Sequence, residues 1–196
     1  MKKFWSNYIS PLFFTSRWNV AITISAVLFV FRFFLARLGI IPYTALLFLL
    51  VLLVMDYLLL FTKNKGIFCT RTHAERFSNG DNNPVIIEVD NRYAFEIKAE
   101  VIDEIPYQFQ RRDILFKAII KPGEHSVITY ELRPVKRGLY NFGTTNLFIK
   151  NSIGLVSRRY KFEQPADVAV YPSYLQMRKY QLMAISNRLS DLGIKK

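Results

Sequence analysis

The chain has 196 residues, of which 51% are hydrophobic, and it carries 27 Lys and Arg against 15 Asp and Glu for a net charge of +12. This length allows one or two domains, and a single cysteine speaks against a disulfide-stapled extracytoplasmic domain. The hydrophobic excess lies almost entirely before residue 62, and the rest reads as ordinary globular sequence. Composition therefore divides the chain into two parts.

The first part holds two long apolar runs, residues 18–36 and 40–61. The first run is interrupted only by Arg32 and the second only by Asp56. A helix needs about 20 apolar residues to cross the hydrocarbon core of a bilayer, and both runs reach that length. The sequence predicts a two-helix transmembrane hairpin over residues 18–62.

The placement of basic residues predicts the orientation of this hairpin, because loops rich in Lys and Arg stay on the cytoplasmic side. The connection between the runs holds only Arg37. The flanking segments are richer in basic residues: Lys2, Lys3 and Arg17 come before, and Lys63, Lys65 and Arg71 come after. We therefore expect a multi-pass protein of the inner (plasma) membrane with both termini in the cytoplasm, and with residues 1–17 as a cytoplasmic N-terminal segment.

Arg32 and Asp56 could form an ion pair inside the membrane, but their depths argue against it. With the turn near Gly39 and a rise of about 1.5 Å per residue, the two side chains differ in depth by roughly 15 Å. Interfacial placement with helix contacts is the favoured interpretation. An ion pathway would require an oligomer.

Residues 63–172 have the pattern of an all-β sandwich. Short β-type runs separated by turn residues follow one another about every ten residues. Alternation is clear near residue 130, where Tyr130 and Leu132 are expected to face inward and Glu131 to face water. The expected strands are "IFCTRTH", "PVIIEVDN", "EIKAEVID", "ILFKAII", "SVITYELR", "LYNF", "NLFIK", "VSRRYKF" and "DVAVYP".

Residues 173–196 are predicted to form a C-terminal helix that leads toward a further domain absent from this chain. Ser173 and Gln176 have the spacing of a capping box. An apolar stripe at helical spacing follows, made of Leu175, Leu182, Ile185, Leu189 and Leu192.

No motif for catalysis, cofactor binding or metal binding is recognisable. His73 and His125 lack a third ligand at a metal spacing, and Cys69 lacks a nearby histidine. Asp103 and Glu104 are adjacent, so on a strand they point to opposite faces and cannot act as a pair. The basic excess is explained by anionic membrane lipid as the partner, whereas a nucleic-acid interface is not favoured. We expect no enzyme activity.

The most patterned stretch is residues 132–160, and we interpret it as structural. Gly138 and Gly143 allow a bulge or tight bend, Tyr140 and Phe142 share a core-facing side, and Gly154 is expected at a positive φ with Leu155 turned inward. Five basic residues would form an edge that is either solvated or a docking surface: Arg133, Lys136, Arg137, Arg158 and Arg159. The candidate docking or structural motif comprises Arg133, Arg137, Gly138, Tyr140, Gly143, Gly154, Leu155, Arg158 and Arg159.

The order "RFSNG", "DEIP", "YELRPVKRGLYNFG", "NSIGL" and "AVYP" resembles bacterial membrane-anchored proteins grouped as domain of unknown function family fifty-eight. The resemblance implies two membrane helices, an immunoglobulin-like sandwich and a following von Willebrand factor A-like domain. It also implies a MoxR-type AAA+ ATPase as protein partner. Asn151 and Ser152 stand where that family usually has Asp-Pro, and the family's later Gly-Asp…Arg…Trp segment is absent from these residues.

These observations lead to one main hypothesis and two alternatives. The main hypothesis is a non-enzymatic inner-membrane anchor and scaffold that presents the cytoplasmic sandwich and a downstream domain to a protein partner. The first alternative is an extracytoplasmic ligand-binding or adhesion sandwich with inverted topology. The second is an enzyme whose polar cluster forms only in the folded sandwich.

Overall fold

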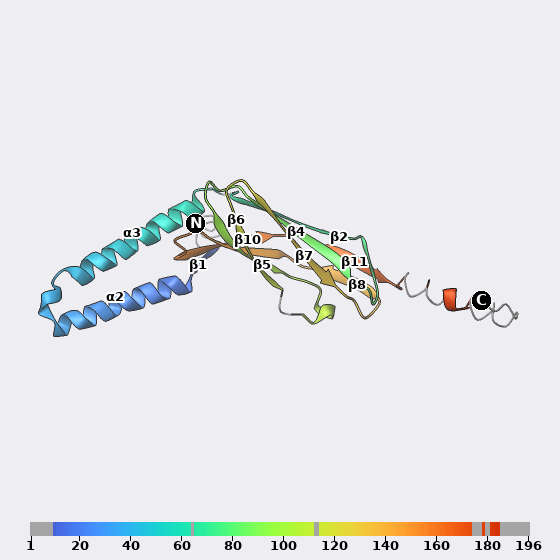
Figure 1. The fold of residues 1–196 in the computed structure, drawn as a ribbon, viewed down its shortest axis with the longest axis horizontal. Helices are drawn as coiled ribbons and strands as arrows, with labels where there is room; N and C mark the ends of the chain where they lie inside the picture. Colours follow the sequence, from blue (N-terminus) through green and yellow to red (C-terminus); the bar gives the residue numbers. More distant parts are fainter. Residues whose placement is uncertain (1–9, 64, 112–113, 174–177, 179–180, 185–196) are drawn as a thin grey trace, which may run out of the picture.

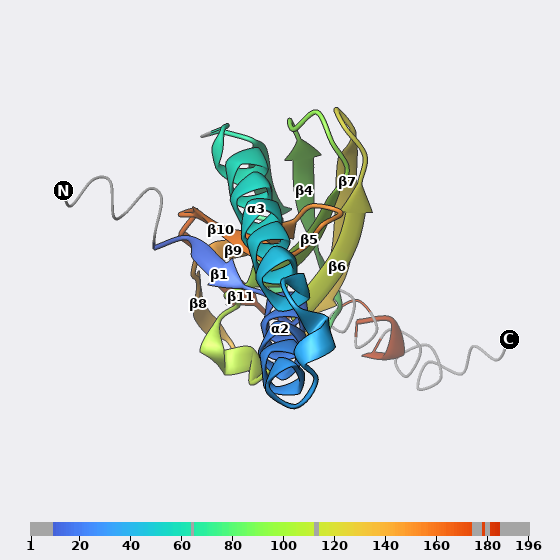
Figure 2. The ribbon, with the colours of Figure 1, turned by 90° about the vertical axis from the view of Figure 1, so that its left-hand side faces the viewer.

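The computed structural model describes residues 10–63, 65–111, 114–173, 178 and 181–184. Two long helices project from one end of an elongated β-sandwich, and the chain leaves the opposite end after the last strand (Figure 1). Seen from the helix end, the two helices stand one above the other in front of the strands (Figure 2). The molecule therefore has two distinct poles.

The hairpin consists of α2 (Ser16–Phe34) and α3 (Ile41–Phe61), joined by the 3-10 turn η2 (Ala36–Leu38). Pro42 lies in the first turn of α3, where its missing N–H costs no hydrogen bond. Ser25 is the only buried residue of α2, and most of the apolar side chains of this helix are exposed. With 19 and 21 residues, both helices are long and apolar enough to span a membrane. They start and end within two residues of the predicted runs.

The first layer of the sandwich is a five-stranded sheet in the order β1-β10-β9-β5-β6. All neighbours in it are antiparallel. Its strands are β1 (Leu12–Phe14), β5 (Ile97–Asp103), β6 (Leu115–Ile120), β9 (Thr145–Lys150) and β10 (Val156–Phe162).

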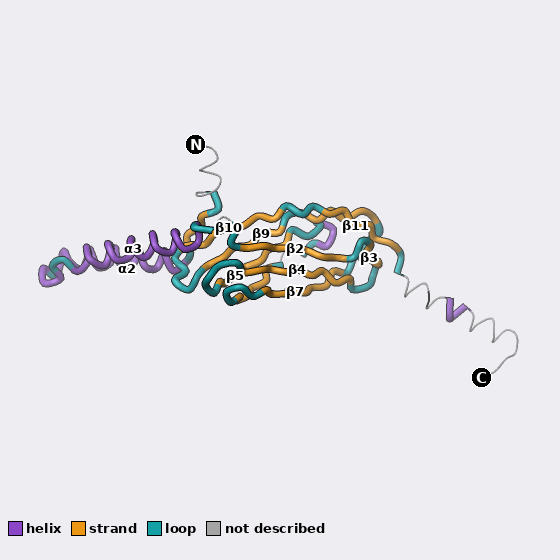
Figure 3. Tube along the Cα trace, turned by 90° about the horizontal axis from the view of Figure 1, so that it is seen from above, coloured by secondary structure: helices purple, strands orange, loops and turns teal. Residues whose placement is uncertain are grey.

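A three-stranded antiparallel sheet, β2-β4-β7, forms the facing layer, and its strands lie side by side in the view from above (Figure 3). Its strands are β2 (Ile67–His73), β4 (Asn83–Asn91) and β7 (His125–Leu132). A third sheet, β3-β11-β8, lies toward the end away from the helices and contains β3 (Arg76–Ser78), β8 (Gly138–Phe142) and β11 (Ala166–Tyr171). The short 3-10 turn η3 (Tyr107–Phe109) follows β5.

The core lies between the first two sheets. Alternate residues of β4, namely Val85, Ile87 and Val89, have no exposed surface. From the facing sheet, Val101 and Leu147 are equally buried. This alternation is what a strand produces when one face meets the core and the other meets water, and it confirms the predicted all-β sandwich.

The structure differs from the sequence-based expectation at both ends of the domain. Residues 12–14, placed in a separate N-terminal segment, form strand β1 and pair with β10. At the other end, residues 178 and 181–184 are helical. Most of the predicted capping box and apolar stripe, including Gln176, falls outside the described residues. Ser173 itself bonds to Asp81, with 2.5 Å between Oγ and Oδ2.

Candidate functional site: the junction between hairpin and sandwich

The loop of residues 151–155 is where both helices attach to the sandwich. Asp56, near the end of α3, is fully buried. Its Oδ2 accepts the backbone N–H groups of Leu155 at 2.7 Å and Val156 at 2.8 Å. A buried carboxylate is costly unless donors meet its charge. Here two N–H groups meet Oδ2, while Oδ1 has no hydrogen-bond partner among the described residues. These hydrogen bonds attach α3 to the loop.

The start of α2 holds the same loop from the other side. Thr15 donates its backbone N–H to the Leu155 carbonyl at 3.1 Å and its hydroxyl to the Gly154 carbonyl at 2.6 Å. Arg17 Nη1 donates to the carbonyls of Ser152 and Ile153 at 3.2 and 3.1 Å. Six successive residues, 151–156, therefore have most of their backbone polar groups engaged by the hairpin or by the loop itself.

The shape of this loop depends on Gly154, which has a φ of +67°. The Asn151 side chain accepts the Gly154 N–H at 2.9 Å and closes the turn. Leu155 is 7% exposed, so it points inward as expected. The sequence-based expectations for Gly154 and Leu155 are confirmed.

Arg158 of β10 caps the C-terminal end of α3. Its Nη1 donates to the carbonyls of Leu60 at 2.7 Å and Lys63 at 2.8 Å. A cation at a helix C-terminus compensates the unpaired carbonyls there. The guanidinium also lies 4.6 Å from the ring centres of Phe61 and Tyr160. Arg158 is 6% exposed, so its predicted place on a solvated or docking edge is wrong.

Tyr93 completes this end of α3. Its hydroxyl donates to the Leu60 carbonyl at 2.6 Å and lies 2.7 Å from the Tyr160 hydroxyl. Burial raises the pKa of Tyr93 well above its usual range, and the Tyr160 hydroxyl adds to this shift. The phenol therefore stays protonated as a hydrogen-bond donor to the helix end.

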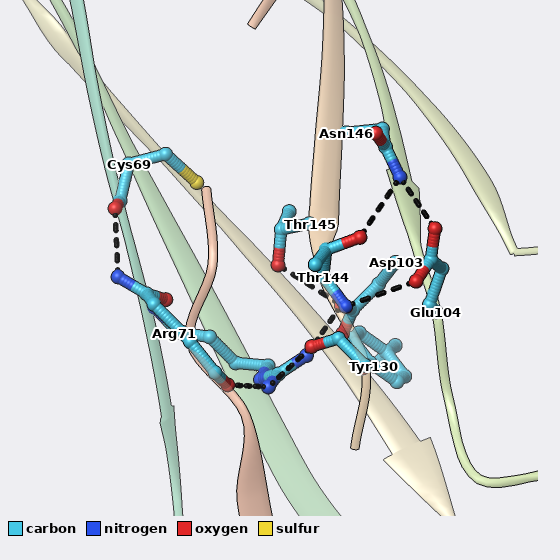
Figure 4. Close-up of polar contacts among 10 residues, drawn as sticks. Cys69, Arg71, Asp103, Glu104, Tyr130, Thr144, Thr145 and Asn146 are labelled. Carbon is cyan, nitrogen blue, oxygen red and sulfur yellow. Dashed lines mark hydrogen bonds and ion pairs between the residues drawn. The ribbon is translucent and has the colours of Figure 1, made fainter. Parts of the chain in front are cut away.

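A second buried polar network links the two main sheets inside the sandwich (Figure 4). Arg71 of β2 forms an ion pair with Asp103 of β5 at 2.7 Å, with side chains 1% and 0% exposed. Asp103 also accepts hydrogen bonds from Tyr130 at 2.5 Å and Thr145 at 3.0 Å. The second guanidinium nitrogen of Arg71 donates to the carbonyls of Gly143 and Gln164.

This network connects the two sheets through buried polar contacts. Both charges are matched and hydrogen-bonded in several directions, which is the condition under which a buried ion pair is tolerated. Burial raises the pKa of the Tyr130 hydroxyl, followed in effect by the Asp103 charge. Glu104 lies outside this network and accepts hydrogen bonds from the Thr144 N–H and the Asn146 amide. These contacts agree with the expectation that Asp103 and Glu104 point to opposite faces.

The remaining motif residues do not share one surface with the junction. Arg133 is exposed and donates to the Gly80 carbonyl at 2.6 Å. Arg137 is also exposed and comes directly before β8 in the chain. Gly138 has a φ of +141°, and a Cβ on Gly143 would meet the Glu104 side chain at 2.7 Å. Tyr140, 2% exposed, donates to the Lys136 carbonyl. The five basic residues therefore do not form a continuous edge.

Arg159 follows Arg158 in β10. It donates through Nε and Nη2 to the Asn146 side chain at 3.0 and 2.7 Å. Arg32, for its part, donates to the Tyr43 hydroxyl and lies 4.5 Å from the centre of that ring. Asp56 has its partners in the sandwich rather than in a helix. Arg32 and Asp56 thus each have a partner of their own.

The described residues contain no group of three or more His, Cys, Asp or Glu side chains that could hold a metal ion. His73 stacks on Phe142 with ring centres 5.1 Å apart. Cys69 is fully buried, and burial, followed in effect by the Asp103 charge, raises the pKa of its thiol to about 12. Its thiolate is therefore almost absent at neutral pH.

No protein-family model and no curated protein sequence matches the chain. Among solved structures, it is similar to a PapD-like domain of human CEP192, with 9% identity, a TM-score of 0.40, and coverage of 55% of this chain and 87% of that one. It is also similar to the CARDB domain of the PF1109 protein from Pyrococcus furiosus, solved with di-metal ions, with 16% identity, a TM-score of 0.35, and coverage of 54% and 87%. Likenesses this distant carry no argument about function.

Proposed function

We propose that the chain is a non-enzymatic anchor and scaffold, whose hairpin inserts into a bacterial inner membrane and holds the sandwich against the cytoplasmic face. The observation that carries this proposal is the junction. Asp56 of α3 and Thr15 and Arg17 before and in α2 all bond to one loop of the sandwich. A flexible tether would need none of these contacts, whereas a scaffold that sets the position of a domain would need all of them.

The distribution of charge supports the cytoplasmic placement. Arg17, Lys63 and Lys65 lie at the sandwich end of the hairpin, while Arg37 lies in the turn at its far end. This is the asymmetry that the positive-inside rule relates to orientation. The proposal also includes a protein partner, a MoxR-type AAA+ ATPase, and the family resemblance is the observation behind it.

Orientation can be tested with two engineered cysteines, each in a Cys69→Ala background. Removing the single native cysteine leaves the engineered one as the only thiol of each variant. Ile40, 74% exposed at the start of α3, is replaced in one variant (Ile40→Cys) and exposed Glu124 in the other (Glu124→Cys). We expect a membrane-impermeant maleimide to label residue 40 in intact spheroplasts and residue 124 only after permeabilisation. The reverse pattern would establish the inverted topology of an extracytoplasmic sandwich.

The partner can be tested separately. The detergent-purified chain is titrated with a purified MoxR-type ATPase from the same genome, with and without ATP, and binding is followed by light scattering. Complex formation that depends on nucleotide would support the scaffold role. Failure of every such ATPase to bind would remove this partner while leaving the anchor proposal in place.

A further inference from the structure

A basic pocket of about 480 Å³ lies where the start of α2 meets the outer face of the five-stranded sheet. Its lining includes four basic residues, namely Arg17, Lys98, Lys117 and Lys150, and one acidic residue, Glu100. Glu100 bonds to Lys150 at 2.8 Å. Among the described residues, the side chains of Lys98 and Lys117 have no hydrogen bond or ion pair, although Glu100 lies opposite Lys117 in the strand register. With four basic residues and one acidic residue in its lining, the pocket carries net positive charge.

The strand register increases this imbalance. Lys98 of β5 and Lys150 of β9 are directly opposite each other as paired residues. Like charges in such cross-strand positions repel and destabilise a sheet. An anion between them would convert the repulsion into attraction. Glu100 already meets the charge of Lys150, so Lys98 is the lysine of this pair whose charge has no ion-pair partner in the described part of the chain. Its position opposite Lys150 is an observation, independent of the pocket's shape, that favours a negatively charged ligand.

The first turn of α2 contributes further positive character. Ser16 and Arg17 line the pocket, and α2 has neither an acidic residue in its first turn nor a side chain that caps its N-terminus. The N–H groups at a helix start carry partial positive charge and bind phosphate and carboxylate groups. The helix start and the lysines therefore converge on the same volume.

An apolar groove continues from this pocket along α2. It is lined by Ser16, Arg17, Val20, Ala21 and Ile24 and has a volume of about 330 Å³. Ser16 and Arg17 belong to both spaces, so a polar site and an apolar track share a border at the start of a helix that is long enough to span a membrane. A free anion would use only the first of these.

We propose that the pocket binds the phosphate headgroup of an anionic phospholipid, with one acyl chain lying along the groove on α2. This inference rests on the proposed insertion of the hairpin. It assigns Lys98, Lys117 and Lys150 to the headgroup and Val20 and Ile24 to the acyl chain. The lipid then neutralises the Lys98–Lys150 repulsion and reinforces the junction from its outer side.

The test uses the full chain in a non-ionic detergent, titrated with dioctanoyl phosphatidylglycerol and followed by native mass spectrometry. The test variant is Lys98→Gln/Lys117→Gln, and the control variant is Lys136→Gln/Arg137→Gln, whose residues precede β8 near the far end of the sandwich. Each basic group near an anionic lipid contributes about fivefold in affinity, so we expect about 30-fold weaker binding in the test variant. The control variant should bind as the unmodified chain does.

Two further arms identify the source of the phosphate. Inorganic phosphate and glycerol 3-phosphate are expected not to compete at millimolar concentration, because neither fills the groove. Competition by either of them that the test variant abolishes would show a soluble anion as ligand and overturn the lipid assignment. Equal retention of lipid by the test and control variants would overturn the pocket itself.

Stability and membrane extraction separate this inference from the proposed function. Removing the Lys98–Lys150 repulsion should leave the Tm of the lipid-free test variant unchanged or raise it, whereas a purely structural role for these lysines would lower it. Carbonate extraction of membranes checks insertion. Release of the unmodified chain by carbonate would contradict the anchor proposal, whereas loss of lipid binding in a chain that stays inserted concerns the pocket alone.

Discussion

Single charged side chains decide how the hairpin and the sandwich fit together. Asp56 stands out in the sequence as the one acidic residue of an apolar run, but its partners are backbone N–H groups 99 and 100 residues further along the chain. Neither spacing nor composition relates residues so far apart, and backbone donors leave no mark on the side-chain pattern. For this reason the sequence predicted the glycine and leucine of the loop but not what holds the loop.

Replacing Asp56 tests the junction directly. Asp56→Ala removes the acceptor of two buried N–H groups, and hydrogen bonds to a charged partner are worth about 1.5–3 kcal/mol each. We expect the opening free energy of the Leu155 and Val156 amides to fall by about 3 kcal/mol, measured by hydrogen exchange in detergent micelles. Asp56→Asn keeps one oxygen acceptor and should lose clearly less. Unchanged exchange in Asp56→Ala would show that the carboxylate does not hold the loop.

The Arg71–Asp103 pair gives a second test at this scale. Asp103→Ala leaves a buried guanidinium uncompensated, which costs about 3–5 kcal/mol. We expect a corresponding drop in the free energy of unfolding in urea. The double variant Arg71→Met/Asp103→Ala should be more stable than Asp103→Ala alone, because no unpaired charge remains. The single variant Arg71→Met completes the cycle. If its loss and that of Asp103→Ala add up to the loss of the double variant, the two residues are not energetically coupled.

At the scale of elements, the sheet strands were predictable because one face of each packs on the core. Alternation and turn residues mark them, and β2, β4 and β10 lie where the pattern placed them. The three-residue strands β1 and β3 were missed, since neither is long enough to show a period. Residues 12–14 also precede the membrane run and share its apolar character, so only their pairing with β10 reveals a strand.

The loop of residues 151–155 should be sensitive to a single methyl group. Gly154→Ala would force a positive φ of 67° on alanine and place its Cβ 3.2 Å from Arg17 Nη1. We expect a loss of about 1–3 kcal/mol in thermal unfolding. Gly123 is a matched control, because its φ is +72° but a Cβ there meets nothing within 4 Å. Equal losses at both positions would mean that backbone strain alone matters and that contact with Arg17 does not.

At the scale of the whole molecule, the two ends of the sandwich join different segments of the chain. One pole joins helices to sheet through residues 151–158. At the other pole the last strand ends at Tyr171, and Asp81 accepts the hydroxyl groups of Ser78 and Ser173, each at 2.5 Å. These two hydrogen bonds, that of Ser173 first, lower the pKa of the Asp81 carboxyl below its ordinary value of 3.8. The exit of the chain from the sandwich is therefore fastened to the turn after β3.

This fastening predicts a response to acid. Because the folded-state pKa of Asp81 is lowered, its contribution to stability is present above the unfolded pKa and is lost as the pH falls through the folded value, below about pH 4. Ser173→Ala should raise the pKa of Asp81 toward 3.8, measured by carboxyl-resolved NMR titration. Ser10→Ala, in the described residues near the opposite pole, serves as the control. An unmoved Asp81 titration in Ser173→Ala would show that the exit is not held by this bond.

The long strands connecting these poles determine a distance. At about 3.3 Å per residue, the nine residues of β4 span about 30 Å, and they run from the turn beside Ser78 to the end next to α3. Tyr171, where the last strand ends, therefore lies about one strand length from the end of the sandwich that α3 joins. Under the proposed insertion of the hairpin, this length sets how far from the bilayer surface the chain leaves the sandwich.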